Sequence, residues 1–111
     1  MNETTNKKKE LKTTFHEEED GSVVMNFEGW LDTTAAIQAK RDMTILNDKL
    51  DRNIVLDLSG LDYISSSGLR LFLNLLKESR AHGGSLCLTG ASDYIRQVFF
   101  DVGFTKIFTI R

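Results

Sequence analysis

Three consecutive hydroxyl side chains, Ser65, Ser66 and Ser67, stand between an apolar segment and a run with helical spacing. A serine in such a place can attack a substrate, accept a phosphate or cap the helix. A serine nucleophile needs a nearby base, and the only histidines are His16 and His82. His82 lies at the far end of the helix predicted after the serines, roughly 20 Å away at about 1.5 Å per residue. The G-x-S-x-G elbow is also absent, so we expect no hydrolase and no enzyme.

Phosphate acceptance fits the position of the serines better than catalysis does. The first N–H groups of a helix have no partner within the helix, and together with the helix dipole they favour negative charge. A phosphate on one of the serines would add a charge of about −2, which the start of this helix could stabilise. N-capping is the simpler role, and it needs only one of the three hydroxyls. The spacing alone leaves both roles open.

The residue types that bind metals or nucleotides form no known pattern. The motifs H-E-x-x-H, G-x-G-x-x-G and G-x-x-x-x-G-K-[ST] are absent, so we expect no metal site and no cofactor. Cys87 is the only cysteine and lies in an apolar run, which predicts a buried side chain rather than a ligand. Asp57 and Asp62 are predicted to flank a loop after a buried strand, where open sheets often bind ligands. We interpret them as solvated loop carboxylates.

The composition is that of one soluble globular domain. Of 111 residues, 41% are hydrophobic and 27% are charged, and the net charge of −2 predicts no nucleic-acid partner. No apolar run approaches the roughly 20 residues of a membrane span, and the N-terminal lysines precede no apolar core of a secretory signal. We therefore expect a cytoplasmic protein without a membrane partner. Residues 1–11 are predicted to form a disordered polar tail, and residues 12–111 the domain.

The first part of the domain is predicted to contain a hairpin and a helix. Asp20 and Gly21 are a turn signal, and the alternation of Val23, Met25 and Phe27 predicts the strand that follows. Side chains that can cap a helix occur at residues 32–34. After them, apolar residues recur at helical steps of three and four: Ala36, Ala39, Met43, Leu46 and Leu50.

The second part of the domain is predicted to alternate strands and helices. Short apolar strands are expected at residues 53–58, 85–89 and 106–110. The helix after the serines should end at Gly83, and another should run from Ser92 to Gly103. The apolar stripe of that last helix comprises Ile95, Val98, Phe99 and Val102. The order β-β-α-β-α-β-α-β predicts an α/β fold, a mixed sheet with an N-terminal hairpin and β-α-β crossovers, with helices packed on the sheet.

The helix after the serines carries more apolar residues than one sheet-facing stripe needs. At about 100° per residue, that stripe comprises Leu69, Phe72, Leu73 and Leu76. Leu71 and Leu75 fall beside the polar arc. They are expected either to pack against a neighbouring helix or to form an exposed patch beside the serines, as partner-binding surfaces do.

Three segments of the sequence resemble the STAS domains, the family that includes the anti-sigma factor antagonists of bacteria. Residues 65–69, Ser-Ser-Ser-Gly-Leu, resemble the motif with which the family opens a helix after a strand. Residues 27–35 resemble its Gly-x-Leu-Asp element, and residues 95–104 resemble its closing pattern. The resemblance covers about residues 13–111. It implies a mixed sheet packed by helices, in agreement with the element order.

The resemblance also implies a regulatory cycle. In the family, the unphosphorylated antagonist binds an anti-sigma factor that is also a serine protein kinase, and this frees the sigma factor for transcription. The kinase then phosphorylates the serine at the helix start, which ends the binding, and a PP2C-type phosphatase restores it. By motif position the acceptor is Ser66, with Ser65 and Ser67 as alternatives, and Asp32 matches the acidic position near that serine.

The partner surface implied by the resemblance lies around the start of the helix. It comprises Asp32, Thr33, Ser65, Ser67, Gly68, Leu69, Arg70 and Leu71. Two features depart from the family pattern: the best-known members have Asp where this chain has Ser65, and the family usually adds a C-terminal helix where this sequence stops. We therefore expect apolar surface near the last strand that is exposed, or covered by a partner or by a second copy in a weak homodimer.

Two other functions are alternatives to the antagonist. A STAS scaffold in another complex, such as a stress-signalling assembly or a lipid-transport accessory, would use the serines only as helix caps. A small nucleotide-binding or hydrolytic domain is the second alternative, and no motif in the sequence supports it. Detection of the phosphorylated protein in cells would favour the antagonist over the scaffold.

Overall fold

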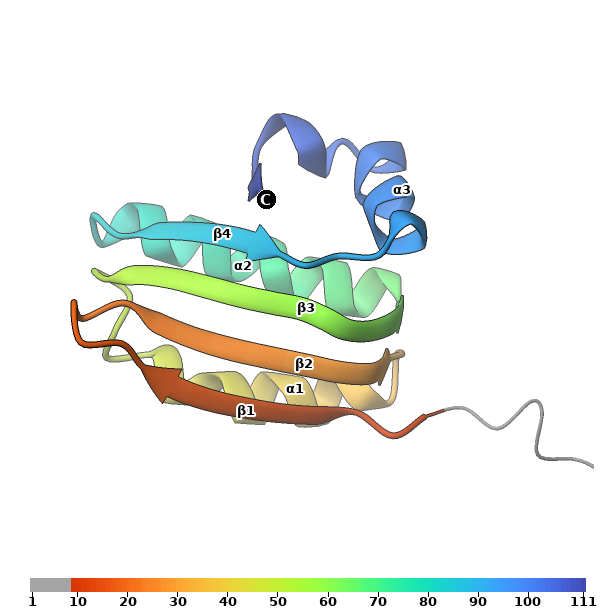
Figure 1. The fold of residues 1–111 in the computed structure, drawn as a ribbon, viewed down its shortest axis with the longest axis horizontal. Helices are drawn as coiled ribbons and strands as arrows, with labels where there is room; N and C mark the ends of the chain where they lie inside the picture. Colours follow the sequence, from red (N-terminus) through yellow and green to blue (C-terminus); the bar gives the residue numbers. More distant parts are fainter. Residues whose placement is uncertain (1–8) are drawn as a thin grey trace, which may run out of the picture.

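The computed structural model describes residues 9–111, which form a five-stranded sheet in the order β1-β2-β3-β4-β5 (Figure 1). β1 (Lys12–Glu17) pairs antiparallel with β2 (Val23–Leu31). The remaining strands join the sheet by parallel pairing: β3 (Asn53–Ile64), β4 (Ser85–Thr89) and β5 (Thr109–Ile110). The predicted α/β class, the N-terminal hairpin and the mixed sheet are therefore confirmed.

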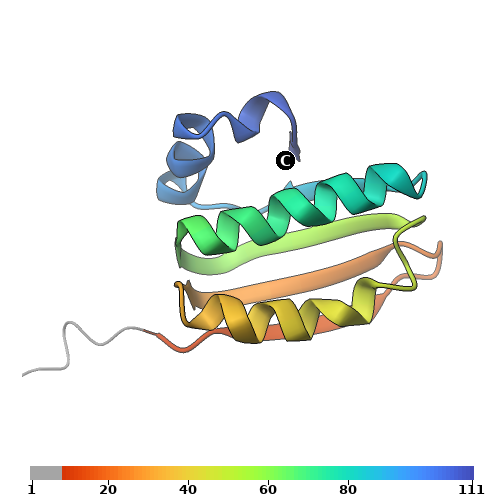
Figure 2. The ribbon, with the colours of Figure 1, turned by 180° about the vertical axis from the view of Figure 1, so that it is seen from behind.

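Two helices cover one face of the sheet. Figure 2 shows α1 (Ala35–Asp42) and α2 (Ser66–Ala81) side by side on this face. The short 3₁₀-helix η2 (Met43–Leu46) continues α1, whereas α3 (Asp93–Asp101) and the 3₁₀-helix η3 (Phe104–Lys106) lie beyond β4 (Figure 1). Because β2 and β3 are parallel neighbours, the helices that follow them start at the same end of the sheet.

The core lies between the sheet and these two helices. Alternate residues of β2 point toward α1 and α2, so Val23, Met25, Phe27 and Leu31 are buried. The rings of Phe27 and Phe72 meet edge to face with their centroids 5.3 Å apart. The apolar face predicted after the hairpin is also buried, and it comprises Ala36, Ala39, Met43, Leu46 and Leu50.

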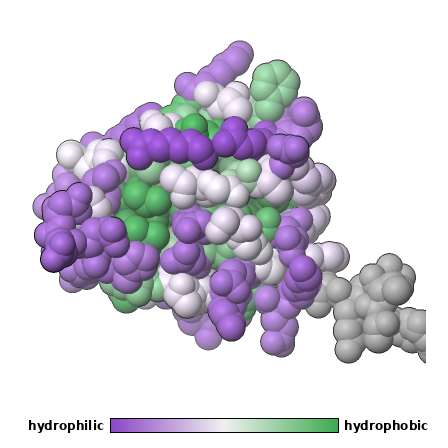
Figure 3. Space-filling model, viewed as in Figure 1, coloured by the Kyte–Doolittle hydropathy of each residue, from purple (hydrophilic) through white to green (hydrophobic). Residues whose placement is uncertain are grey.

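The opposite face of the sheet is left uncovered by α1 and α2, and polar side chains are prominent on it (Figure 3). Asn26 links three strands there, since its Oδ1 accepts a hydrogen bond from Thr14 Oγ1 at 3.3 Å and its Nδ2 donates to Asp57 Oδ2 at 3.0 Å. Asp57 and Asp62 both lie within β3, so their placement beside a loop was wrong. Asp62 instead forms an exposed ion pair with Lys9, with Nζ and Oδ2 2.7 Å apart.

Several boundaries differ from those predicted. β3 runs six residues beyond the predicted end at Leu58, because its pairing with β2 shifts register twice, between Asp57 and Gly60 and between Leu61 and Tyr63, and so continues through polar residues. The last strand contains only Thr109 and Ile110, since the chain before it turns into η3. Val102, predicted to lie on the buried stripe of α3, is 49% exposed because the helix ends before it.

The two ends of the hairpin region also need correction. Residues 1–8 of the predicted tail lie outside the described residues, but Leu11 is buried in the core and belongs to the domain. The connection between β1 and β2 is longer than a two-residue turn, because Glu18 N–H donates to Ser22 O at 2.8 Å across residues 19–21. Gly21 has the positive φ of 91° that this loop requires. The backbone N–H of Ser22 donates to Asp20 Oδ1 and lowers the pKa of that carboxyl group.

The surplus apolar residues of α2 pack against α1. Leu75 is buried and Leu71 is half-buried, and both face Lys40 of α1 and Met43 of η2 across a shared pocket. The sequence left two alternatives open for these residues, packing against a neighbouring helix or an exposed patch. Leu75 packs against the neighbouring helix, and Leu71 is partly packed there and partly exposed.

Ser79 on α2 is expected to reduce stability. Its side chain is fully buried, and within residues 9–111 its Oγ has no hydrogen-bond partner. Leaving such a group unsatisfied costs roughly 1–3 kcal/mol, so Ser79→Ala should raise the free energy of unfolding by about 1 kcal/mol and the melting temperature by about 4 °C. Thermal unfolding checks this. Ser85→Ala is the control, since the exposed Ser85 hydroxyl donates to Asn53 Oδ1, and a fall in the melting temperature of Ser79→Ala would contradict the expectation.

Candidate functional site

The three serines have three different environments at the junction of β3 and α2. Ser65 is the N-cap residue, with extended backbone angles (φ −91°, ψ 170°), and its Oγ accepts a hydrogen bond from Gly68 N–H at 3.2 Å. Its own N–H donates to Leu31 O at 2.8 Å, which ties the junction to the end of β2. Ser65 is only 8% exposed, whereas Ser66 is exposed and Ser67 is half-buried. The first serine therefore caps the helix, and the second is the hydroxyl most open to solvent.

The cap should depend on the oxygen of residue 65. Ser65→Ala removes the acceptor for Gly68 N–H, and the loss of an N-cap of this kind costs about 1 kcal/mol of unfolding free energy. Ser65→Asp keeps an acceptor oxygen and complements the helix dipole, so it should remain within about 0.5 kcal/mol of the wild type. Urea unfolding of the two variants tests this. Equal destabilisation by both would show that the hydrogen bond is not what stabilises the junction.

Gly68 lets the start of α2 lie against the sheet. A Cβ at this position would stand 2.7 Å from Leu31 Cγ and 2.9 Å from Ile64 Cγ1, closer than side-chain carbons pack. The residue is buried, as is Leu69, which belongs to the hydrophobic core. Ser65, Gly68 and Leu69 were predicted to contact a partner, but all three residues are buried and lie beneath the surface. This is a correction to the predicted surface.

Asp32 lies just before α1, beside the serines. Leu31 at the end of β2 pairs with Ile64 at the end of β3, so Asp32 and Ser65 follow their strands at the same end of the sheet. The Asp32 carboxylate accepts a hydrogen bond from Ala35 N–H at 2.8 Å, and its backbone oxygen accepts one from Ala36 N–H at 2.9 Å. Of the predicted capping residues, Asp32 thus supplies the side-chain oxygen. The register of two parallel strands brings the two motifs together.

The exposed part of the predicted surface lines a depression between α1 and α2. Thr33, Ser67, Arg70 and Leu71 border a pocket of about 370 Å³. α1 completes the lining with residues that were not predicted, among them Ile37 and Lys40. Ile37 is 63% exposed, because it lies off the buried stripe formed by Ala36 and Ala39. An apolar residue outside the helical stripe was the signal in the sequence that could have identified it.

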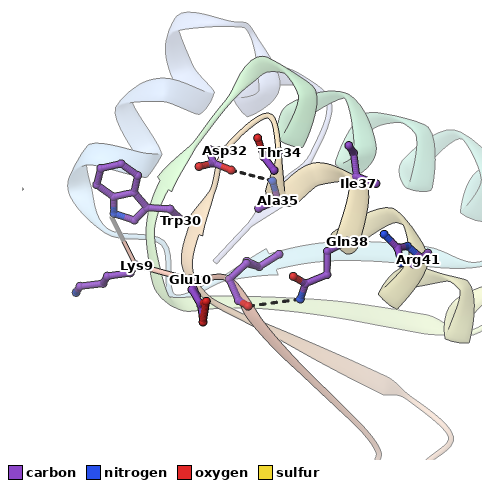
Figure 4. Close-up of a pocket in the computed structure, with 10 residues that line it drawn as sticks. Lys9, Glu10, Trp30, Asp32, Thr34, Ala35, Ile37, Gln38 and Arg41 are labelled. Atoms are coloured by element: carbon purple, nitrogen blue, oxygen red, sulfur yellow. Dashed lines mark hydrogen bonds between the residues drawn. The ribbon is translucent and has the colours of Figure 1, made fainter. Parts of the chain in front are cut away.

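A second pocket, of about 450 Å³, is lined by Asp32 and Trp30 at the start of α1 (Figure 4). The chain at residues 9–11 forms one wall, with Gln38 Nε2 donating to Leu11 O at 3.4 Å and Trp30 N–H donating to Lys9 O at 3.3 Å. Gly29 has φ +91° and passes so close to Glu10 O that a Cβ could not fit. This pocket is larger than the one beside the serines, and Ile37 borders both.

The described residues form neither a metal cluster nor a membrane-spanning helix. Within residues 9–111, no group of three or more His, Cys, Asp or Glu side chains is arranged to hold a metal ion. None of the helices in that part of the chain is long and apolar enough to cross a membrane. Cys87 is buried in β4, as predicted.

Comparisons with known proteins agree with the fold and with the motif. The model of the STAS domain family matches residues 15–111. BtrV of Bordetella bronchiseptica, named as a candidate anti-sigma factor antagonist, is 37% identical over 91 residues, which are 82% of this chain and 78% of that protein.

Two solved structures share the fold. A candidate anti-sigma factor antagonist from Thermotoga maritima has a TM-score of 0.76 at 24% identity, covering 87% of this chain and 83% of its own. The phosphorylated form of the Bacillus cell fate determinant SpoIIAA has a TM-score of 0.68 at 22% identity, covering 90% of this chain and 91% of its own. The family model matches most of the chain, and the chain has the sheet and helices of these structures. It therefore belongs to the STAS domain family.

Proposed function

We propose that this protein is an anti-sigma factor antagonist whose binding is switched off by phosphorylation of Ser66. The observation that carries the proposal is the division of roles among the serines. Ser65 is buried and occupied as the cap, while Ser66 is exposed at the first position of α2. The identity to BtrV supports the class of function, and the existence of a phosphorylated SpoIIAA with this fold supports the type of switch.

A phosphate at Ser66 is compatible with the folded domain. It would stand at the positive end of the α2 dipole, where first-turn N–H groups have no intrahelical acceptor. The same charge is incompatible with a close interface, because it would have to be desolvated there without a counterion. Phosphorylation can therefore end partner binding without unfolding the antagonist.

In the proposed cycle the chain itself catalyses nothing. The partner is an anti-sigma factor that is also a serine protein kinase, and it transfers the γ-phosphate of ATP to Ser66 Oγ. A PP2C-type phosphatase hydrolyses the phosphoserine and restores binding. This cycle places the protein in the cytoplasm of a bacterium, where sigma factors act. The surface that binds the anti-sigma factor includes Thr33, Arg70 and Leu71 from the depression beside the serines.

Mapping of the phosphorylated residue tests this proposal. The purified protein is incubated with its anti-sigma factor and ATP, and the site is identified by tandem mass spectrometry. We expect one phosphate, on Ser66, that is lost in Ser66→Ala and retained in the matched control Ser67→Ala. Full phosphorylation of Ser66→Ala would refute the site. A protein that no anti-sigma factor binds or phosphorylates would instead be a STAS scaffold whose serine only caps α2.

A further inference from the structure

The depression beside the serines is one end of a longer groove between α1 and α2. A third pocket continues this depression and shares Lys40, Leu71 and Asn74 with it. Together the two pockets, which we call the α1–α2 groove, extend along α2 from Ser67 to Glu78. At about 1.5 Å per residue this is roughly 16 Å, the length of a three-turn helix. Its shape is suited to an amphipathic helix, which binds by laying its apolar face into a groove.

The groove is apolar at its centre. Ile37 from α1 is 63% exposed, and Leu71 from α2 is half-buried at the helix contact. The deeper side chains, Met43, Leu50 and Leu75, are buried and also border the groove. Covering the exposed side chain of Ile37 with an apolar partner would favour association, since free energy falls by roughly 25 cal/mol per Å² of apolar surface removed from water.

The end of the groove near the serines is positively charged. Lys40 on α1 and Arg70 on α2 border it from both sides, and that pocket has no acidic residue in its lining. Among the described residues, neither Lys40 nor Arg70 forms an ion pair. This local positive charge contrasts with the net charge of −2 of the whole chain. The opposite end of the groove carries Glu78. Charge complementarity therefore selects an occupant that is acidic at the serine end.

Arg70 also lies within reach of the proposed phosphorylation site. Ser66 and Arg70 are four residues apart on α2, and residues at this spacing are neighbours on a helix surface. Both side chains are exposed. A guanidinium group binds a carboxylate or a phosphate with the same fork of N–H donors. Arg70 can therefore pair either with a carboxylate of the partner or with a phosphate on Ser66. The second pair lies entirely within α2, so it would make Arg70 unavailable to the partner.

We propose that the α1–α2 groove binds an acidic amphipathic helix of the anti-sigma factor, and that Arg70 is the residue for which that helix and the Ser66 phosphate compete. The inference rests on the proposed function, and it names the part of the partner that is bound. In the unphosphorylated protein, Arg70 and Lys40 pair with carboxylates of the partner helix. In the phosphorylated protein, Arg70 pairs with the phosphate, which also repels those carboxylates. Phosphorylation thus withdraws Arg70 from the partner's carboxylates and places a negative phosphate beside them.

The first test uses the antagonist alone. Phosphoserine is incorporated at residue 66, and the second ionisation of the phosphate is followed by phosphorus NMR in the wild type, Arg70→Gln and Lys77→Gln. A neighbouring cation favours the dianion, so we expect Arg70→Gln to raise the pKa of the phosphate by about half a unit. Lys77→Gln removes the same charge from α2 about three turns away and should leave that pKa unchanged. The same pKa in all three proteins would overturn the pairing.

The second test measures binding to the anti-sigma factor by calorimetry at several salt concentrations. Arg70→Gln and Lys40→Gln should each weaken binding about tenfold and reduce its dependence on salt, whereas Lys77→Gln should do neither. If the wild type binds but both groove variants bind equally well, the groove assignment is wrong and the proposed function stands. If no anti-sigma factor binds the wild type, the proposed function fails, and the phosphorus measurement alone decides the role of Arg70. A dimer that buries Ile37 in sedimentation and cross-linking would identify a second copy as the occupant and overturn the assignment.

Discussion

Gly68→Val is expected to lower the free energy of unfolding by about 3 kcal/mol. A Cβ at residue 68 already meets Leu31 Cγ at 2.7 Å and Ile64 Cγ1 at 2.9 Å, and valine adds two methyl groups in the same space. To relieve the overlap, the first turn of α2 must move away from the ends of β2 and β3. The Ser65 cap and the exposed position of Ser66 both depend on that turn.

Lys77→Val provides the matched control for this prediction. It introduces the same β-branched residue into α2 at an exposed position, so it carries the propensity cost of valine, about half a kcal/mol, without the overlap. Urea unfolding of both variants gives the difference. If Gly68→Val were as stable as Lys77→Val, the close approach of α2 to the sheet would not constrain residue 68. The explanation given for a glycine at this position would then fail.

The second large effect is expected at Ser66. Ser66→Asp places a carboxylate where the antagonist meets its partner, and it should weaken binding to the anti-sigma factor at least about 100-fold, or roughly 2.7 kcal/mol. Ser66→Ala removes only an exposed hydroxyl and should bind as the wild type does. Both variants should keep the wild-type melting temperature within about 2 °C, because Ser66 makes no contribution to the cap.

Ser85→Asp is the control for charge. Ser85 is an exposed serine at the start of β4, at the end of the sheet opposite to the serine motif, so an added carboxylate there should leave binding unchanged. Calorimetry with the anti-sigma factor compares the three variants. Tight binding by Ser66→Asp would show that negative charge at this residue does not act as the switch, whereas loss of binding by Ser85→Asp would point to an effect of net charge.

Much of the fold follows from local patterns in the sequence. The period of two in β2 predicted a strand, and the three- and four-residue steps after Asp32 predicted a helical face, and the same residues are buried in the structure. The predicted helix is shorter than expected, since α1 ends at Asp42, Met43 and Leu46 belong to η2, and Leu50 lies beyond both. The cap at Ser92 and the left-handed Gly103 (φ +83°) that follows the end of α3 were also predicted, because each depends on the chemistry of one residue.

The extent of β3 could not be predicted in the same way. Ser59, Gly60 and Asp62 interrupt the apolar pattern, and two register shifts in the pairing with β2 keep the strand continuous past them. Pairing between strands that are far apart in the sequence decides this, and local propensity does not report it. The last strand is shorter than predicted for the opposite reason, since the apolar Ile107 and Phe108 follow η3 in a turn, where the ring of Phe108 packs on that of Phe104 with centroids 4.7 Å apart.

The candidate site was predicted in outline and completed by tertiary structure. The spacing left capping and phosphate acceptance both open, and the backbone angles and the hydrogen bond at Ser65 assign the cap to the first serine. Gly68 and Leu69 were placed on the partner surface because they belong to the motif, whereas Gly68 lies against Leu31 and Leu69 is buried in the hydrophobic core. Ile37 and Lys40 were missed because they come from α1, some thirty residues earlier, and reach the site only through the packing of α1 on α2.

The central claim is that one phosphate on Ser66 separates the antagonist from its partner while leaving the domain folded. The most direct measurement is calorimetry of the anti-sigma factor with two homogeneous proteins, one unphosphorylated and one carrying phosphoserine only at residue 66. We expect tight binding by the first and at least about 100-fold weaker binding by the second, with the same thermal unfolding for both. Equal affinities, or weaker binding that accompanies unfolding of the phosphorylated protein, would contradict the account.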